Sequence, residues 1–243
     1  MSLPRRKRPV VAIDGPAGAG KSTVTRKVAE RLGYIIVDTG ALYRVVALAA
    51  ERAEVSFDDA ARASALAEAL VAENAVQLRR SESGSVQVLL RGQDVSLAIR
   101  AQNIGQGASK VSAHPGVRQA LLELQRGQGR EGGVVLEGRD IGTVVFPDAE
   151  AKFYLTASAD VRAQRRRDEL AARGTPPTLA EVLSEVNERD RRDSTRPVAP
   201  LKKADDALLV DSSLLSIEQV VELIVATVKT VERKLAGAGV PAQ

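Results

Sequence analysis

Several residue types are absent or scarce in this chain of 243 residues. It has no cysteine and no tryptophan, one histidine and 2% aromatic residues, against 44% hydrophobic residues overall. Without cysteine there can be no disulfide framework, no cysteine-ligated metal and no thiol nucleophile. No metal-ligand cluster or Ser/His/Asp arrangement is visible. His114 precedes Pro115 and Gly116 in a helix break, so we expect a structural role for it.

Long apolar runs are also missing. No run approaches the ~20 residues that cross a membrane, and the N-terminal region lacks the apolar stretch of a signal peptide. We therefore expect a cytoplasmic protein without a membrane partner. The length suffices for one large α/β core with insertions, built from Val, Leu, Ile and Ala.

The net charge of +4 is unevenly placed. Arg5, Arg6, Lys7 and Arg8 alone account for it, so the rest of the chain is near balance. Such a leader could contact nucleic acid. Because no aromatic residues are interleaved with it, we expect a solvated terminus and no specific nucleic acid partner.

The most informative stretch begins with the apolar run Val10–Ile13. Gly15–Ser22 then fits the pattern G-x-x-x-x-G-K-[ST], and apolar residues at helical spacing follow until Gly33. Glycines let successive backbone N–H groups turn towards one anion, and the helix N-terminus adds its positive end. Lys21 can then reach the β- and γ-phosphates, and the Ser22 hydroxyl can ligate Mg²⁺. The motif predicts binding of a nucleoside triphosphate.

Strands and helices alternate along most of the chain. Helical patterns are expected at 41–52, 57–73, 101–128 with a break at 114–116, 158–173, 178–189 and from 216 onwards; core strands are expected at 10–13, 34–37, 133–136, 152–156 and 207–210. Alternation of this kind predicts a doubly wound, parallel, five-stranded sheet of the P-loop NTPase type, with ligands at the carboxyl ends of its strands. A hairpin of runs 76–79 and 86–90, with a turn at Ser81–Gly84, interrupts this order as an insertion.

Polar clusters follow three of the predicted strands: the glycine-rich loop, Asp38-Thr39-Gly40 and Glu137-Gly138-Arg139-Asp140. We expect them to share one site. Asp14, Asp38, Glu137 and Asp140 are all candidates for ordering Mg²⁺ through water or for accepting a proton, and each could instead cap a turn. The sequence alone does not show which of these roles each carboxylate has.

Arginine is concentrated in the predicted loops and in one long segment. Arg44, Arg100, Arg118 and Arg139 follow predicted turns or strand ends, and residues 158–196 hold nine Arg, no Lys and eight acidic residues. A single surface ion pair would contribute little. Because phosphoryl transfer spreads negative charge over the transferred group, mobile arginines that close over it are expected, and we interpret 158–196 as a lid, with a loop at 189–196.

Four stretches together resemble the bacterial cytidylate kinases, within the nucleoside monophosphate kinase superfamily. They are residues 13–22, 38–44, 138–149 and 189–201, and the resemblance extends from about Pro9 to Lys234. The first stretch is generic to phosphate-binding loops, whereas the other three in this order are specific to the family. The resemblance implies transfer of the ATP γ-phosphate to CMP or dCMP, with ATP and Mg²⁺ as cofactors.

Site residues are carried over from the resemblance by position. It implies an ATP-binding loop at Gly15, Pro16, Ala17, Gly18, Ala19, Gly20, Lys21, Ser22 and Thr23, with Ser22 as the metal ligand. The monophosphate nucleotide would be held by Thr39, Arg44, Ser109, Arg118, Arg139 and Asp140, with Asp193 and Arg196 at its sugar and phosphate end. Arg165 and Arg189 would face the ATP phosphates. The expected catalytic residues are Lys21, Arg139, Arg189 and Arg196.

The resemblance also implies a division into parts. The kinase core would comprise 9–73, 98–157 and 197–235, the hairpin 74–97 would belong to an inserted monophosphate-binding domain, 158–196 would form the helical lid, and 1–8 and 236–243 would be flexible. Thr39 stands where the family often has Ser, and Glu137 where it often has Asp. Ser22-Thr23 stands where Gly-Thr also occurs. We expect a monomer.

Two other functions are compatible with parts of the sequence. A kinase for another small acceptor would share the fold, but the stretches at 138–149 and 189–201 argue against it. A P-loop switch or nucleic-acid-binding NTPase would hydrolyse ATP without a dedicated acceptor site, and only the basic leader favours it. If the leader is merely solvated, deletion of residues 1–8 should leave activity intact.

Overall fold

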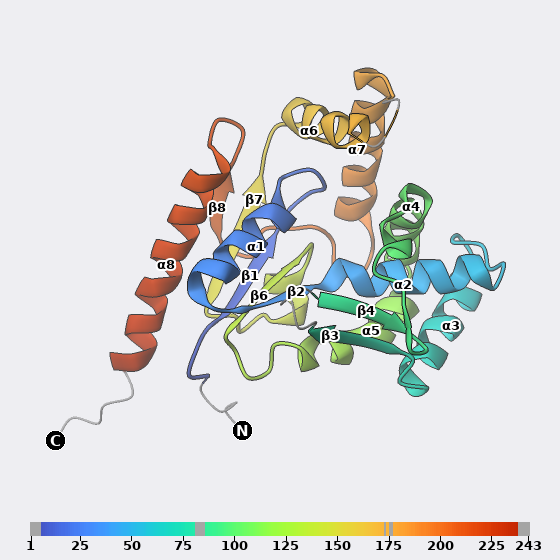
Figure 1. The fold of residues 1–243 in the computed structure, drawn as a ribbon, viewed down its shortest axis with the longest axis horizontal. Helices are drawn as coiled ribbons and strands as arrows, with labels where there is room; N and C mark the ends of the chain where they lie inside the picture. Colours follow the sequence, from blue (N-terminus) through green and yellow to red (C-terminus); the bar gives the residue numbers. More distant parts are fainter. Residues whose placement is uncertain (1–5, 81–85, 173, 175–176, 238–243) are drawn as a thin grey trace. The chain divides into compact units, whose positions relative to one another are not determined.

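The computed structural model describes residues 6–80, 86–172, 174 and 177–237 (Figure 1). The chain divides into two compact units. The first comprises residues 1–37, 129–195 and 199–243, and the second residues 38–128 and 196–198. None of the described helices is long and apolar enough to cross a membrane.

A five-stranded sheet forms the centre of the first unit. Its order is β2 (Ile35–Asp38), β6 (Val134–Gly138), β1 (Val10–Asp14), β7 (Ala151–Thr156) and β8 (Leu208–Asp211). β1 pairs in parallel with β6 and β7, and β7 pairs in parallel with β8. The chain therefore runs from the central β1 to β2 at one edge, returns inwards to β6, crosses β1 to β7 and ends with β8 at the other edge. The predicted α/β class and doubly wound five-stranded sheet are confirmed.

Two helices cover one face of this sheet through a continuous aliphatic core. α1 (Lys21–Leu32) contributes Val24 and Val28, and α8 (Ile217–Gly237) contributes a stripe that includes Val221 and Ile224. They pack on Val11, Ile13, Val135, Phe153 and Leu155 from the strands. α1 ends at Gly33, whose φ of 62° favours glycine at a helix C-terminus. α8 begins with a capping box, in which the backbone N–H groups of Ser216 and Gln219 donate to each other's side chains.

A helical pair in the first unit corresponds to the predicted lid. α6 (Ala159–Ala171) is capped by the Ser158 hydroxyl, and α7 (Leu179–Thr195) begins at the predicted capping box of Thr178 and Glu181. The two helices pack through Ala163, Val182 and Val186, which form a small separate core. A π-helical turn, η2 (Ile141–Val145), follows β6.

The predicted loop at 189–196 is wrong, because α7 continues to Thr195. Glu188 forms ion pairs with Arg191 at 2.8 Å and with Arg192 at 3.6 Å, one helical turn further on. The hydroxyls of Ser194 and Thr195 donate to the Arg191 carbonyl. Spacings of three and four residues between opposite charges support a helix, so a segment dense in both signs here indicates helix and not loop.

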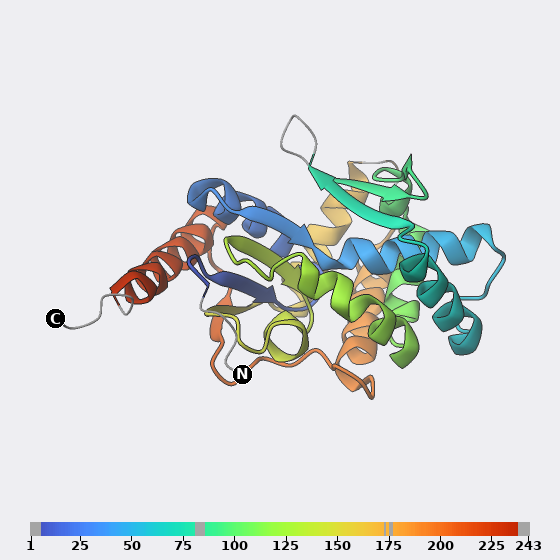
Figure 2. The same cartoon turned by 90° about the horizontal axis from the view of Figure 1, so that it is seen from below.

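The second unit is mainly helical and carries its own small sheet. Its elements are α2 (Thr39–Arg52), α3 (Ala60–Ala72), β3 (Val76–Arg80), β4 (Val86–Leu90), β5 (Gln93–Asp94), η1 (Ala98–Arg100), α4 (Gln102–Val111) and α5 (Pro115–Gly127). β3, β4 and β5 are antiparallel neighbours, and Figure 2 shows β3 and β4 side by side. The hairpin is confirmed, although its predicted turn at Ser81–Gly84 lies outside the described residues. β5 was not expected, because a two-residue strand leaves no periodicity in the sequence.

The expectation of a solvated basic leader is wrong for Arg6 and Arg8. The Arg6 guanidinium donates to Asp148 at 2.8 Å and to Glu150 at 3.2 Å, and lies 5.5 Å from the centre of the Phe146 ring. Arg8 donates to the carbonyl oxygens that end α1 and lies 4.2 Å from the centre of the Tyr34 ring. These side chains attach the leader to the first unit, since cations favour both helix C-termini and aromatic faces.

Candidate active site

The phosphate-binding loop has the backbone that its glycines permit. Gly15 has φ 151°, and a Cβ there would lie 1.9 Å from the carbonyl oxygen of Leu155. Gly20 caps α1 with φ 91°. These conformations exclude larger side chains, so the loop passes close to β7 before turning into the helix. The N-terminus of α1 then points its free N–H groups towards the carboxyl end of the sheet.

Lys21 is buried in this loop beside two other cations. Only 7% of its surface is exposed, and Nζ donates to the Pro16 carbonyl oxygen at 2.7 Å. Burial lowers the pKa of the ammonium well below its usual value, and the nearby Arg139 and Arg189 guanidinium groups lower it further. Glu137 and Asp14 oppose this shift in part. The structure thus brings together three predicted catalytic residues, from the start of α1, the turn after β6 and α7.

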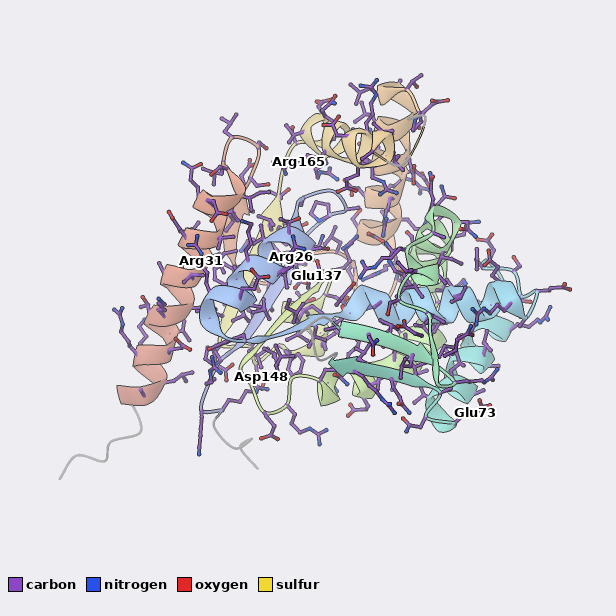
Figure 3. The ribbon with its side chains drawn as sticks, in the orientation of Figure 1. Arg26, Arg31, Glu73, Glu137, Asp148 and Arg165 are labelled. Carbon is purple, nitrogen blue, oxygen red and sulfur yellow. The ribbon has the colours of Figure 1, made fainter. Side chains whose placement is uncertain are left out.

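Ser22 and Glu137 form a pair of oxygen donors next to the loop. The Ser22 hydroxyl donates to a carboxylate oxygen of Glu137 at 2.9 Å, and Glu137 is 7% exposed at the end of β6 (Figure 3). A hydroxyl with a carboxylate matches the preference of Mg²⁺ for hard oxygen ligands. Within the described ranges there is no cluster of three or more His, Cys, Asp or Glu side chains for a metal.

Asp14 connects the end of β1 to the turn after β6. Its two carboxylate oxygens accept the backbone N–H groups of Ile141 and Gly142, both at 2.8 Å. Burial raises the pKa of Asp14 to about 6, although these two hydrogen bonds lower it. Of the four candidate carboxylates, Asp14 is therefore one that stabilises the backbone, since both of its oxygens accept backbone N–H groups. Asp38 is likewise a helix cap, because it accepts the Ala41 N–H at the start of α2.

Arg139 and Asp193, both predicted to bind the acceptor, are in contact. The Arg139 Nε donates to the Asp193 carboxylate at 2.8 Å, and Asp193 is 3% exposed on α7. Burial lowers the pKa of Arg139, but Asp193 and Glu137 outweigh it, so the net shift is upwards. Asp140, the next residue, is also buried and lies close enough to Asp14 to influence its pKa.

Arg165 lies beside the phosphate-binding loop, as its predicted role requires. Its guanidinium donates to the hydroxyl and carbonyl oxygens of Ser212, at 3.1 and 2.8 Å (Figure 3). One of its nitrogens is 4.0 Å from where a Cβ of Gly20 would stand. By contrast, Arg166 pairs with Glu169 on its own helix at 3.2 Å.

The sequence did not predict a role near the loop for three residues: Arg162, Asp190 and Tyr154. Arg162 is 5% exposed and contacts both the loop and Asp190 on α7. Tyr154 lies within β7, and burial raises its pKa, with Asp190 adding to the shift and Arg139 opposing it. An arginine in an amphipathic helix carries no local signal of burial. These roles depend on partners that are distant along the chain.

The second unit gathers four of the predicted acceptor-binding residues. Thr39 begins α2 and is 3% exposed, and Arg44, one turn later, donates to the Ile99 carbonyl oxygen at 3.0 Å. Ser109 is buried on α4, which packs against α2. Arg118 on α5 is 7% exposed and donates to the Ser112 carbonyl oxygen at 3.2 Å.

Tyr43 was not predicted, but its ring lies 5.4 Å from the Arg118 guanidinium. This cation–π contact connects α5 to α2 within the second unit. Arg196, in the short segment of this unit at 196–198, is 6% exposed. His114 Nε2 donates a hydrogen bond to the Phe57 carbonyl oxygen at 2.8 Å, and the residue caps α5, in accordance with the structural role expected of it.

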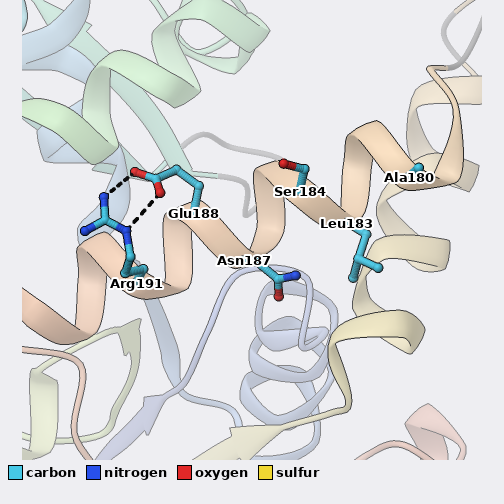
Figure 4. A pocket seen from close by; sticks show the side chains of 6 residues that line it. All are labelled: Ala180, Leu183, Ser184, Asn187, Glu188 and Arg191. Atoms are coloured by element: carbon cyan, nitrogen blue, oxygen red, sulfur yellow. Dashed lines mark hydrogen bonds and ion pairs between the residues drawn. The ribbon is translucent and has the colours of Figure 1, made fainter.

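An open depression of about 510 Å³ lies along α7 (Figure 4). Its lining comprises Ala180, Leu183, Ser184, Asn187, Glu188 and Arg191, and the last two form an ion pair. The lining contains none of the predicted site residues. The chemistry is concentrated instead at the phosphate-binding loop.

Comparison with known proteins identifies the family. The family model described as cytidylate kinase matches residues 11–230. This chain belongs to the cytidylate kinase family. A curated cytidylate kinase of Citrifermentans bemidjiense is 53% identical over 230 residues, covering 94% of this chain and 96% of the relative. One of Geobacter sulfurreducens is 49% identical over 238 residues, covering 98% and 100%.

Solved structures of other kinases are more distant. A gluconokinase from Sinorhizobium meliloti has 14% identity and a TM-score of 0.47, covering 97% of this chain and 100% of that chain. The family assignment depends on the sequence matches, which span the phosphate-binding loop, both units and the helical pair α6–α7.

Proposed function

We propose that this protein transfers the γ-phosphate of ATP to CMP or dCMP, forming ADP and CDP or dCDP. Membership of the cytidylate kinase family supports this reaction. The structural observation that carries it is the placement of the buried Lys21 in the phosphate-binding loop near Arg139 and Arg189: burial, with added repulsion from these two cations, lowers the pKa of Lys21. Such an arrangement is costly unless a polyanion binds to it, and triphosphate groups do so.

ATP would lie with its phosphates on the N-terminus of α1. The backbone N–H groups of Gly15–Thr23 would cradle the phosphate chain, and Lys21 would leave the Pro16 carbonyl to contact the β- and γ-phosphates. Arg165 and Arg189 would approach the phosphates from the helical pair α6–α7. Since these contacts are all polar, the site is suited to stabilising charge.

Magnesium fits the oxygen donors next to this loop. Ser22 would supply its hydroxyl as the metal ligand, and Glu137, which now accepts that hydroxyl proton, would order water around the ion. When bound, Mg²⁺ neutralises charge on the β- and γ-phosphates. The glutamate is one methylene longer than the aspartate that is frequent in the family. We propose that it interacts with the magnesium ion through a water molecule.

The acceptor nucleotide would be recognised by donors and carboxylates together. Arg118, Ser109 and Arg139 can donate to the cytosine O2 and N3 atoms, and Asp140 can accept from the 4-amino group. Thr39 and Arg44 would hold the monophosphate, with Asp193 and Arg196 at the sugar and phosphate end. UMP lacks the 4-amino group, so it would leave a buried carboxylate unpaired and should be rejected strongly.

In this mechanism the protein positions the two nucleotides and stabilises the transferring group. Lys21, Arg139, Arg189 and Arg196 would surround the charge that develops on the phosphoryl group, and no covalent enzyme intermediate is needed. Closure of residues 158–196 over ATP would exclude water and so prevent hydrolysis. We propose that the reaction takes place in the cytoplasm and that a monomer carries it out.

The test is ADP release with ATP and Mg²⁺ in the presence of CMP, dCMP, UMP, AMP or shikimate, or with no acceptor. We expect strong activity with CMP and dCMP only. Activity with another acceptor would retain the phosphate chemistry but contradict the assignment of Arg118, Arg139 and Asp140. Equal ADP release without an acceptor would indicate an NTPase instead.

A further inference from the structure

Arg162 holds the outer side of the phosphate-binding loop. Its Nε donates to the Ala157 carbonyl oxygen at 2.9 Å, and one terminal nitrogen donates to the carbonyl oxygen of Ala17 at 3.1 Å. The other terminal nitrogen donates to Asp190 on α7 at 2.6 Å. One buried guanidinium therefore joins the end of β7, the loop and the second lid helix.

The loop packs directly on the backbone of this residue. Gly18 has φ 77°, and a Cβ there would lie 3.1 Å from both the Cβ and the carbonyl oxygen of Arg162. Ala19, the next residue, directs its carbonyl oxygen to the Ser212 hydroxyl at 3.3 Å. Bonding these carbonyl groups outwards constrains the orientation of the peptide planes whose N–H groups must face the phosphates.

Asp190 depends on Arg162 for much of its stabilisation. One carboxylate oxygen accepts from Arg162, and the other is buried without a hydrogen-bond partner in the described part of the chain. The Asp190 side chain is 26% exposed, so the Arg162 cation stabilises a carboxylate that is only partly in contact with water. Asp190 directly follows Arg189, whose charge reaches Lys21. The Arg162–Asp190 pair thus also orients the segment of α7 that carries a predicted catalytic arginine.

We infer that Arg162 is a positioning residue for ATP: it holds the phosphate-binding loop and the Arg189 segment of α7 in one register through Ala17 and Asp190. It does not contact the substrate itself. Its three directional hydrogen bonds need the planar fork of arginine, which lysine cannot reproduce even though its charge is the same. This inference rests on the proposed function only in taking the bound nucleotide to be ATP.

The test compares Arg162→Lys with Arg166→Lys, which changes a more exposed arginine on the same helix that pairs only with Glu169 among the bonds described above. The Kd of a fluorescent N-methylanthraniloyl ATP is measured first, because it needs no acceptor. KM for ATP, KM for CMP and kcat follow from ADP release. For Arg162→Lys we expect Kd and KM for ATP to rise about tenfold, with KM for CMP changed less than threefold, and for Arg166→Lys no change.

A merely structural role would give a different result. Partial unfolding lowers the concentration of active enzyme, so it reduces kcat and leaves both KM values unchanged. Arg162→Lys with an unchanged Kd for the fluorescent ATP, or with equal increases in KM for ATP and CMP, would overturn the inference. Asp190→Asn should raise KM for ATP by a smaller factor, and the double variant should be no worse than Arg162→Lys alone. Strictly multiplicative effects would contradict the proposed coupling.

If CMP proves not to be an acceptor, the binding measurement still stands. A raised Kd for the fluorescent ATP in Arg162→Lys would then support the positioning role while the proposed function fails. Conversely, strong CMP phosphorylation with an unchanged Kd in this variant would retain the function and reject the role of Arg162.

Discussion

The ammonium of Lys21 is buried beside Arg139 and Arg189, an arrangement of like charges that a bound polyanion would stabilise. Burial and both guanidinium groups disfavour the charged lysine, whereas Glu137 and Asp14 favour it. A triphosphate would reverse the balance by adding negative charge at the same point. Catalytic and binding cations are typically held in such preorganised positions, because no reorganisation is then needed during the reaction.

Replacement of Lys21 by methionine should therefore remove most of the activity. We expect Lys21→Met to lower kcat/KM by roughly 10²-fold or more, since the methionine retains the length of the side chain but not its charge. The matched control is Lys27→Met, which changes an exposed lysine on the same helix that pairs with Glu218. It should retain activity within about twofold. Steady-state rates with ATP and CMP measure both, and equal losses would contradict the assigned role.

Asp14 provides a test based on pH. Its folded-state pKa of about 6 lies above the usual 3.8, because burial disfavours the carboxylate. This contribution to stability is therefore fully present below about pH 4 and is lost as the pH rises through 6. Relative to Asp14→Asn, the wild type should lose roughly 3 kcal/mol of unfolding free energy between pH 4 and 7. Urea denaturation across this pH range measures the difference in unfolding free energy between wild type and variant. If this difference did not change with pH, the raised pKa of Asp14 would be refuted.

At the residue scale, the sequence was sufficient where a short motif specifies the backbone. Gly15–Ser22 predicted the loop, the strand before it and the helix after it, because glycine conformations and helix capping are local. It was not sufficient for Arg162, whose partners Ala17 and Asp190 lie 145 and 28 residues away. No spacing rule encodes such contacts.

Among the elements, α7 shows how charge pattern should be interpreted. Glu188 pairs with Arg191 and Arg192 at helical spacing, so the segment 189–195, which we expected to be part of a loop, continues the helix. The capping boxes at Thr178 and Ser216 were both predicted correctly, since their signature is local. Local signals thus located the starts of these helices better than their ends.

The capping box of α8 permits a direct prediction. Ser216→Ala removes the hydroxyl that accepts the Gln219 N–H, and should reduce the unfolding free energy by about 1 kcal/mol. Thr227→Ala is the control, because this exposed hydroxyl only donates back to the Leu223 carbonyl of the same helix. It should be neutral or slightly stabilising. Urea denaturation distinguishes the two, and equal effects would show that the cap contributes nothing.

The leader is a second element whose role can be measured. Arg6→Ala removes two ion pairs and a cation–π contact and should reduce the unfolding free energy by ~1–2 kcal/mol without changing kcat. Lys7→Ala, at an exposed neighbouring position, should change it by less than about 0.5 kcal/mol. Deletion of residues 1–8 should accordingly lower the melting temperature while the purified protein stays active. If the Arg6→Ala variant were as stable as the wild type, the original expectation of a solvated leader would be supported instead.

At the scale of the whole molecule, the two units divide the proposed chemistry. The first carries the phosphate-binding loop, Arg139, Asp140 and the helical pair α6–α7; the second carries Thr39, Arg44, Ser109 and Arg118. The alternation of strands and helices predicted the sheet, because parallel pairing requires crossovers. It did not predict that α2–α5 pack with the hairpin as one unit, since packing between helices depends on side-chain shape. The proposed boundaries of core, insertion and lid therefore remain predictions.

The central claim is phosphoryl transfer from ATP to a cytidine monophosphate, and it is tested most directly by identifying the products. The enzyme is incubated with ATP, Mg²⁺ and CMP, and ³¹P NMR follows every phosphorus-containing species over time. We predict that CDP and ADP appear in equal amounts with no inorganic phosphate. ADP together with inorganic phosphate, and no CDP, would contradict the account and identify the protein as a hydrolase.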